Sequence, residues 1–466
     1  MKHTKIICIY LLLSAMLSCK KWLDVRPATE IKQENMFETE TGFKEALFGV
    51  YMKMGKTASY GGTLTLTILD VLAQYYNVQD FNNKYANVGK YNYRDIQVRT
   101  AIDSVWNLQY ECIANLNNLL AAVDQQKSVF SGQHYEMVKG EALGLRAFLH
   151  FDLLRIYGPV IATGAAKKAI PYITTFGKLV TPQSTATEIM DKCLQDLDAA
   201  DSLLKVQQQL FYADPDAFRS YTRNHFNYWA VQALRARIYL YKGDKVKALQ
   251  YAKSVIDEAR FTFGDPNTFN ATYNSDRTFS TEHIFAIQVS DLKILYDREF
   301  KPGSTNAVTI YQLPTVVDDM FEVTKGGATD YRYRYLVARQ GDVSLFTKYN
   351  QDVNGALEIE GQIPLIKLPE LYYIAAEASP DKNLALTYLN TIRSKRGLVG
   401  LPTPIDEATL TAELTKEYTK EFCSEGQLFF YFKRLNRSQI PRTAVQMNEA
   451  TYVLPLPDNE VEFGNR

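Results

Sequence analysis

A polar segment rich in aromatic side chains, residues 76–93, carries the groups best suited to bind a small polar ligand. Aromatic rings pack against the C–H faces of sugar rings, while amide, carboxylate and guanidinium groups hydrogen-bond to hydroxyls. A second group of such side chains lies around Tyr296, Asp297 and Arg298. The candidate ligand-binding residues are Tyr76, Asn77, Asp80, Phe81, Tyr85, Tyr296 and Arg298. For each aromatic residue, packing against a neighbouring helix is the alternative explanation.

Catalysis would need a defined set of reacting groups, and the sequence offers only isolated acidic pairs. Asp318-Asp319 and Glu358/Glu360 are the pairs that could supply the two carboxylates of a glycoside hydrolase. Acidic residues in loops are usually solvated, and the sequence contains no GxSxG, HExxH or phosphate-binding loop. We therefore expect a binding protein and predict no catalytic residue.

The composition argues against a metal centre and against nucleic acid as a partner. The five cysteines (8, 19, 112, 193 and 423) contain no CxxC spacing, and the five histidines are scattered. Lys+Arg and Asp+Glu both number 52, which gives a formal net charge of zero. We expect no metal, no cofactor and no nucleic-acid partner.

The first 18 residues have the features of an export signal. A basic start precedes an apolar run over residues 6–17, which is too short to span a bilayer stably. Cys19 follows directly, as in a bacterial lipobox, although Met16 and Leu17 depart from the stricter pattern. This resemblance implies cleavage before Cys19 and attachment of lipid to its sulfur. An ordinary secretory signal followed by a chance cysteine is the alternative.

A long helix is predicted for residues 141–157, where two apolar lines recur at helical spacing and Gly158-Pro159 ends the helix. Two apolar lines on one helix indicate burial nearly all round. Arg146, Asp152 and Arg155 lie on this helix, and buried guanidinium groups require carboxylate or carbonyl partners. We expect these three residues to form internal ion pairs that stabilise the fold, and not to bind a ligand.

Repeated helix pairs give the predicted fold class. Residues 225–260 contain two helices, with small residues at the crossing and a Gly243-Asp244 turn, and resemble a tetratricopeptide unit. Residues 371–396 form a weaker copy, and the region of the long helix is a possible third. Such units stack into a superhelix. We therefore predict a mainly α protein, a tetratricopeptide-like superhelix with an irregular subdomain that contains a few short strands.

Changes in pattern along the chain predict five parts. Turn signals and two short strand-like runs, 284–290 and 344–350, mark an irregular region between helical ones. The predicted parts are a signal peptide (1–18), an extended lipid-anchored lead-in (19–36), an N-terminal helical region (37–260), an irregular insertion (261–364) and a C-terminal helical region with a tail (365–466).

Several ordered segments together resemble the SusD/RagB family of outer-membrane nutrient-binding lipoproteins. The matching stretches are WLDVRP after Cys19, MFETETGFKEALFGVYMKM (36–54), EALGLRAFLHFDLLRIYGPV (141–160), IPLIKLPELYYIAAEA (363–378), ALTYLNTIRSKRGL (385–398), EYTKEFCSEGQLFFYFKRLN (417–436) and LPLPDNEV (454–461). The chain departs from the family at Tyr418 and Gln427, where Arg is usual. These two differences argue against a local salt-bridge network at that point.

The resemblance implies a lipoprotein on the outer surface of the outer membrane that is not an enzyme. Family members bind glycans or other nutrients and close over a TonB-dependent transporter of the SusC type. The expected partners are therefore an oligo- or polysaccharide, a SusC-type transporter and the outer membrane, reached through the lipid on Cys19. A tetratricopeptide-like scaffold that binds only proteins is the alternative function.

Overall fold

The computed structural model describes residues 36–266, 276–301, 309–351 and 360–464. The predicted signal and lead-in, the proposed lipid-attachment residue Cys19 and the acidic residue Glu358 lie outside these ranges.

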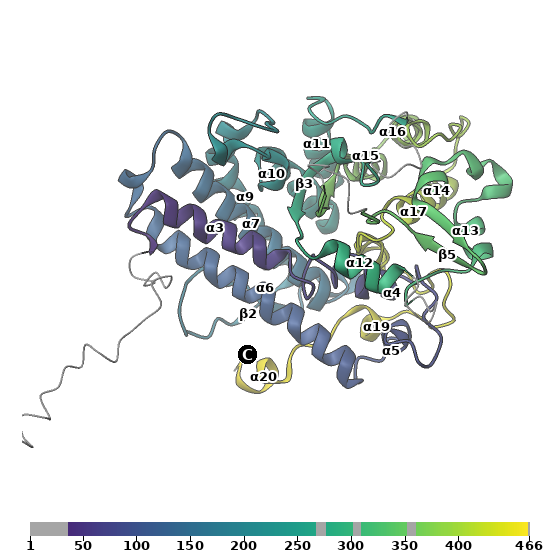
Figure 1. Cartoon of the computed structure of the whole chain (residues 1–466), viewed down its shortest axis with the longest axis horizontal. Helices are drawn as coiled ribbons and strands as arrows, with labels where there is room; N and C mark the ends of the chain where they lie inside the picture. The colour runs from purple at the N-terminus through teal and green to yellow at the C-terminus, as the bar shows by residue number, and fades with distance from the viewer. Residues whose placement is uncertain (1–35, 267–275, 302–308, 352–359, 465–466) are drawn as a thin grey trace, which may run out of the picture.

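The chain is mainly helical, with a few short strands, as the sequence predicted (Figure 1). The helices are α3 (Glu40–Met54), α4 (Ile68–Leu72), α5 (Ala86–Gly89), α6 (Ile96–Val123), α7 (His134–Tyr157), α8 (Ile161–Gly164), α9 (Ala186–Leu204), α10 (Tyr228–Lys242), α11 (Lys245–Ile256), α12 (Leu292–Phe300), α13 (Pro314–Met320), α14 (Tyr331–Leu336), α15 (Leu368–Ala378), α16 (Lys382–Lys395), α17 (Glu407–Glu421), α18 (Gln427–Arg434), α19 (Glu449–Tyr452) and α20 (Asp458–Phe463).

Helices that follow one another in the chain stack in the tetratricopeptide-like manner. α6 and α9 both pack on α7, α10 packs on α11, and α11 packs on α15, which in turn pairs with α16. The α10–α11 turn contains Gly243 at φ 80°, a left-handed conformation that favours glycine. The side chain of Asp244 then caps α11 by accepting a hydrogen bond from the Lys247 N–H. The helix pair predicted for residues 225–260 is thus confirmed.

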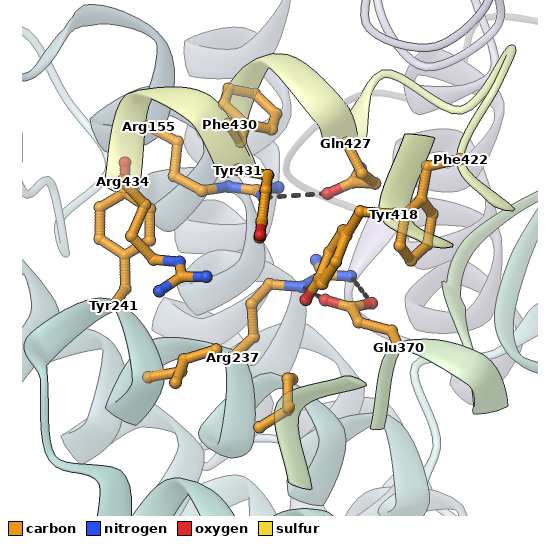
Figure 2. A pocket seen from close by; sticks show the side chains of 12 residues that line it. Arg155, Arg237, Tyr241, Glu370, Tyr418, Phe422, Gln427, Phe430, Tyr431 and Arg434 are labelled. Carbon is orange, nitrogen blue, oxygen red and sulfur yellow. Dashed lines mark hydrogen bonds and ion pairs between the residues drawn. The ribbon is translucent and has the colours of Figure 1, made fainter. Parts of the chain in front are cut away.

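The long helix α7 is buried nearly all round, as predicted, but it begins at His134, before the predicted start at residue 141. Its arginines form internal ion pairs, as expected. Arg146 forms a bidentate ion pair with Asp196, with Nη2 2.6 Å from Oδ1 and Nε 2.7 Å from Oδ2. Arg155 pairs with Asp152 and also donates to Gln427 Oε1 at 3.0 Å (Figure 2).

Charged groups lie around a small internal space of about 40 Å³ beside Arg155 (Figure 2). Arg237 on α10 binds both oxygens of Glu370 on α15 at 2.6 Å. At the two positions where the chain departs from the family pattern, Tyr418 stacks on Tyr431 with ring centroids 4.2 Å apart, and Gln427 accepts from Arg155. The positive charges of Arg155 and Arg237 are therefore balanced by Asp152 and Glu370, without a charged residue at 418 or 427.

The strands form three antiparallel pairs. β3 (His283–Gln288) pairs with β6 (Gln362–Lys367). The irregular segment between these two strands therefore begins and ends at the same sheet. β4 (Val337–Gln340) pairs with β5 (Val343–Phe346), and β1 (Lys168–Pro171) pairs with β2 (Gln183–Thr185). The strand-like runs at 284–290 and 344–350 are thus confirmed in part, as β3 and β5.

The apolar run over residues 64–76 favours a helix or an apolar approach to one, and the structure has only the short helix α4, Ile68–Leu72, within it. The hydroxyl of Thr65 donates to Tyr60 O and that of Thr67 donates to Gly62 O. Such side-chain bonds to the backbone compete with helix formation. The loop expected after this segment also contains α5, and the tail expected to be irregular contains α19 and α20.

His150 on α7 is held as a neutral ring. Its Nε2 accepts from the Ile173 N–H at 3.0 Å, which places the proton on Nδ1, beside Arg146 O at 2.9 Å. Burial lowers the pKa of His150 from 6.5 to about 3.

This geometry predicts a pH-dependent loss of stability that the His150→Gln variant lacks. Because the folded pKa lies below 6.5, the unfolded chain takes up the proton first, and stability falls as the pH drops below 6.5. The contribution is roughly 1.4 kcal/mol per pH unit, or about 2 kcal/mol at pH 5. Urea unfolding of both proteins at pH 7, 6 and 5 measures the difference. Parallel pH profiles would contradict the assignment.

Candidate functional site

A cavity of about 530 Å³ lies between the loop after α4 and two later segments of the chain. We call it the 74–90 cavity. It is lined by residues between Gln74 and Lys90, by Gln312, Leu313 and Val316, and by residues 442–445. The first wall belongs to the polar, aromatic segment singled out from the sequence, and the other walls come from the second half of the chain.

The base of this loop is fixed by the buried carboxylate of Asp70 on α4. Asp70 accepts hydrogen bonds from the Ser424 N–H, from the Gly426 N–H at 2.9 Å and from the Tyr76 hydroxyl at 3.2 Å. Burial raises the pKa of Asp70 well above its ordinary value, and the two N–H groups oppose that rise. Ser424 (φ 65°) and Gly426 (φ 70°) are both left-handed, which lets this turn direct its N–H groups to one carboxylate.

The rest of the loop is held by its asparagines. Asn77 N–H donates to Tyr311 O, and Asn83 Nδ2 donates to Thr309 O, both at 2.7 Å. Asn83 Oδ1 also accepts from the Tyr85 N–H at 2.9 Å, an Asx-type turn within the loop. The high asparagine content of this segment is therefore explained partly by turn formation and docking, and not by ligand contact alone.

Arg442 and Gln74 form a strained pair at the wall of the cavity. Both have positive φ angles, 67° and 62°, and Arg442 Nε donates to Gln74 O at 2.7 Å. Arg442 Nη2 is buried and has no hydrogen-bond partner among the described residues. Each left-handed residue costs of the order of 1–3 kcal/mol, and so does an unmet buried donor. Such costs concentrate where a ligand is bound, which makes this cavity the candidate site.

The structure divides the sequence-predicted residues between different places. Tyr76 and Asn77 line the 74–90 cavity, whereas Tyr85 and Arg298 line a smaller cavity of about 220 Å³. Asp80 and Phe81 are exposed on the loop, with Phe81 89% exposed, and they line neither cavity.

Two of the predicted aromatic residues present no free ring face. Tyr76 and Tyr296 are only 4% and 2% exposed. The Tyr76 hydroxyl bonds with Asp70 and Ser424, and the Tyr296 hydroxyl donates to Phe346 O at 3.0 Å. The expectation that these rings are exposed for stacking on a ligand is therefore wrong, because neighbouring segments pack over them.

Arg298 is partly committed to an internal carboxylate. Its Nε donates to Glu299 Oε1 at 2.8 Å, and Lys84 Nζ donates to the same oxygen at 2.6 Å. Glu299 itself is fully buried. Tyr85 is half-buried beside this group, and burial raises its pKa. Arg298 and Lys84 thus neutralise Glu299, and this limits what they can offer a ligand.

Arg442, Gln312 and Lys90 line the 74–90 cavity but were not predicted. They come from three separate segments, and no motif marks them in the sequence. Pro441 indicates only a turn before Arg442. Their convergence depends on the folded chain.

A larger cavity of about 630 Å³ lies elsewhere, between α3, residues 217–225 and the β3–β6 pair. Its wall includes the exposed apolar residues Phe48 and Met52 as well as Tyr221. None of the sequence-predicted binding residues lines it. It is the more apolar of the two spaces and less suited to a ligand rich in hydroxyls.

Asp318 and Glu360, one from each acidic pair considered for catalysis, lie in different places. Asp318 accepts from Arg339 and Tyr333, while Glu360 lies on the wall of the larger cavity. Within the described ranges, no group of His, Cys, Asp or Glu side chains is arranged to hold a metal ion. No helix in those ranges has the length and apolarity required to cross a bilayer.

Comparison with known proteins gives consistent matches in sequence and fold. Residues 21–240 match a SusD-like family model described as starch-binding and associating with the outer membrane. SusD-like protein P2 of Formosa agariphila is 23% identical, over 99% of this chain and 97% of that protein. SusD-like protein P25 of the same organism is 21% identical, over 60% of this chain and 52% of that protein.

Solved structures share the fold over almost the whole chain. A SusD-like carbohydrate binding protein from Bacteroides vulgatus superposes with a TM-score of 0.73 at 19% identity, covering 92% of this chain and 96% of that one. A SusD superfamily protein from Bacteroides thetaiotaomicron gives 0.71 at 21% identity, covering 91% and 98%. In sequence this chain is similar to SusD-like proteins, and it shares the fold of SusD superfamily structures.

Proposed function

We propose that this protein binds an oligo- or polysaccharide, or another nutrient rich in hydroxyls, in the 74–90 cavity and catalyses no reaction. The observation that carries the proposal is the unpaired, buried Nη2 of Arg442 on the wall of a cavity of about 530 Å³. The family model's description as starch-binding supports the ligand class.

The cavity offers the two kinds of surface that a sugar needs. The side chains of Asn77 and Gln79 supply amide donors and acceptors around it, and Leu313 and Val316 supply apolar surface for C–H faces. Phe81 lies close by in the chain, with its ring open to solvent. In this proposal Phe81 packs on a sugar unit that extends out of the cavity.

The proposal includes delivery of the ligand at the cell surface. Lipid on Cys19 anchors the protein to the outer membrane, and a SusC-type TonB-dependent transporter receives the bound glycan. The family model's description as associating with the outer membrane supports this location. The alternative, a tetratricopeptide-like scaffold that binds only proteins, would instead use an apolar surface such as the one with Phe48 and Met52.

The direct test is a binding screen of the purified protein against a panel of poly- and oligosaccharides. Affinity electrophoresis identifies glycans that slow the migration of the protein through the gel, and calorimetry with defined oligosaccharides gives the affinity. We expect at least one glycan class to bind. Binding to no glycan, together with copurification of a transporter, would favour the protein-only scaffold.

Replacing Phe81 by Ala is expected to weaken binding of the identified glycan by about 3- to 10-fold, the loss of one ring-stacking contact. Phe81 is almost fully exposed, so the thermal unfolding midpoint stays the same. The matched control is Phe176→Ala, which removes a 48% exposed ring that lines none of the four cavities described above. Equal affinities of Phe81→Ala and wild type would remove Phe81 from the site.

Replacing Cys19 by Ala is expected to release the protein from membranes, because the proposed lipid is attached to that sulfur. Fractionation of cells that express each form, followed by immunoblotting, measures the change. Phe176→Ala, treated in the same way, remains in the membrane fraction. Retention of the Cys19→Ala form in that fraction would contradict the lipid anchor.

A further inference from the structure

The charged side chains on the wall of the 74–90 cavity are all positive. Lys90 and Arg442 line the cavity, and none of the described residues on its wall is acidic. The chain as a whole carries equal numbers of acidic and basic residues, 52 of each. The positive cavity is therefore a local feature and not a consequence of a basic protein.

Arg442, which is half-buried, differs from three buried arginines of the structure. Arg146, Arg237 and Arg396 each bind both oxygens of one carboxylate, those of Asp196, Glu370 and Glu282. Arg442 has no ion pair among the described residues. Its Nε bonds to Gln74 O, and its Nη2 is buried without a partner.

The groups around Arg442 compensate little of its charge. The Tyr75 ring lies 5.9 Å from the guanidinium carbon, and Asp319, whose carboxylate also acts on Arg442, forms no ion pair with it and does not line the cavity. Burial lowers the pKa of Arg442, and Tyr75, Cys423 and Asp319 only partly oppose this change. A half-buried cation with so little compensation is stabilised when an anion is placed beside it.

Lys90 supplies a second cation on the same wall. It follows α5 directly, and its backbone N–H donates to Ala86 O, so its position in the chain is fixed by the end of that helix. Its side chain is exposed and forms no ion pair within the described part of the chain. An anion in the cavity would therefore have one half-buried and one exposed positive partner.

We propose that the ligand of the 74–90 cavity is an acidic glycan, with one carboxylate or sulfate group bound by the guanidinium of Arg442 and by Lys90. This inference rests on the proposed function and names its substrate class. A guanidinium bound to a carboxylate or sulfate forms a charge-assisted hydrogen bond, stronger than the bond it would make to a neutral hydroxyl.

The test compares matched charged and neutral glycans by calorimetry. One arm uses oligogalacturonate and its fully methyl-esterified form, which differ in the carboxylate charge. The other arm uses a sulfated galactan oligosaccharide and its desulfated form. We expect wild type to bind the charged member at least tenfold more tightly in one arm, and that arm identifies the anion as uronate or sulfate. The preference should shrink between 50 and 300 mM salt.

Variants locate the preference in the cavity. Lys90→Gln should reduce the affinity for the charged glycan about three- to tenfold and leave the affinity for the neutral one unchanged. The Lys90→Gln/Arg442→Gln double variant should lose the preference. The control, Lys178→Gln, removes an exposed positive charge away from the cavity wall and should change neither affinity. If Arg442→Gln lowers the thermal unfolding midpoint, the affinities of the Lys90→Gln variant alone decide whether the charge preference arises in this cavity.

The outcomes separate this inference from the proposed function. If charged and neutral glycans bind equally, or if only neutral glycans bind, the acidic ligand is wrong and the glycan-binding function stands. A charge preference that persists in the double variant would place the anion outside this cavity. If no glycan of either kind binds, the proposed function fails and this inference fails with it.

Discussion

The buried carboxylate of Asp70 is the constraint on which the candidate site depends. Its partners Ser424 and Gly426 lie 354 and 356 residues further along the chain. An ionised carboxylate without partners in this position would cost several kcal/mol, so the start of the loop and the turn that contains Ser424 stay together. Arg442 adds a second tie through its bond to Gln74 O. The cavity exists because these two ends of the chain are joined.

The same C-terminal segment also fixes the cavity to the helical scaffold. α18 begins directly after Gly426 and carries Lys433 near its end. Lys433 Nζ donates to Arg155 O at 2.7 Å and to Gly158 O at 2.8 Å, at the C-terminal end of α7. Burial lowers the pKa of Lys433 to about 7, and its amine satisfies carbonyls left free at this helix end. One short helix thus connects the long core helix with the base of the binding loop.

Local patterns in the sequence predicted the scaffold well, and they predicted the site poorly. The burial of α7 and the turn at Gly243-Asp244 between α10 and α11 follow from residues a few positions apart. The burial of Tyr76 and Tyr296 depends on segments that fold over them, and no local pattern reports it. Arg442 reaches the cavity from a distant, irregular part of the chain. A binding site formed by such convergence is visible only in the folded structure.

The central claim is that a glycan binds in the 74–90 cavity. Hydrogen–deuterium exchange of the protein, with and without a saturating amount of the glycan found in the screen, tests it most directly. The account predicts slower amide exchange in residues 74–90 and 440–445 when glycan is bound, with no change in α3 or residues 217–225. Protection confined to α3 and residues 217–225, which line the larger cavity, would contradict it.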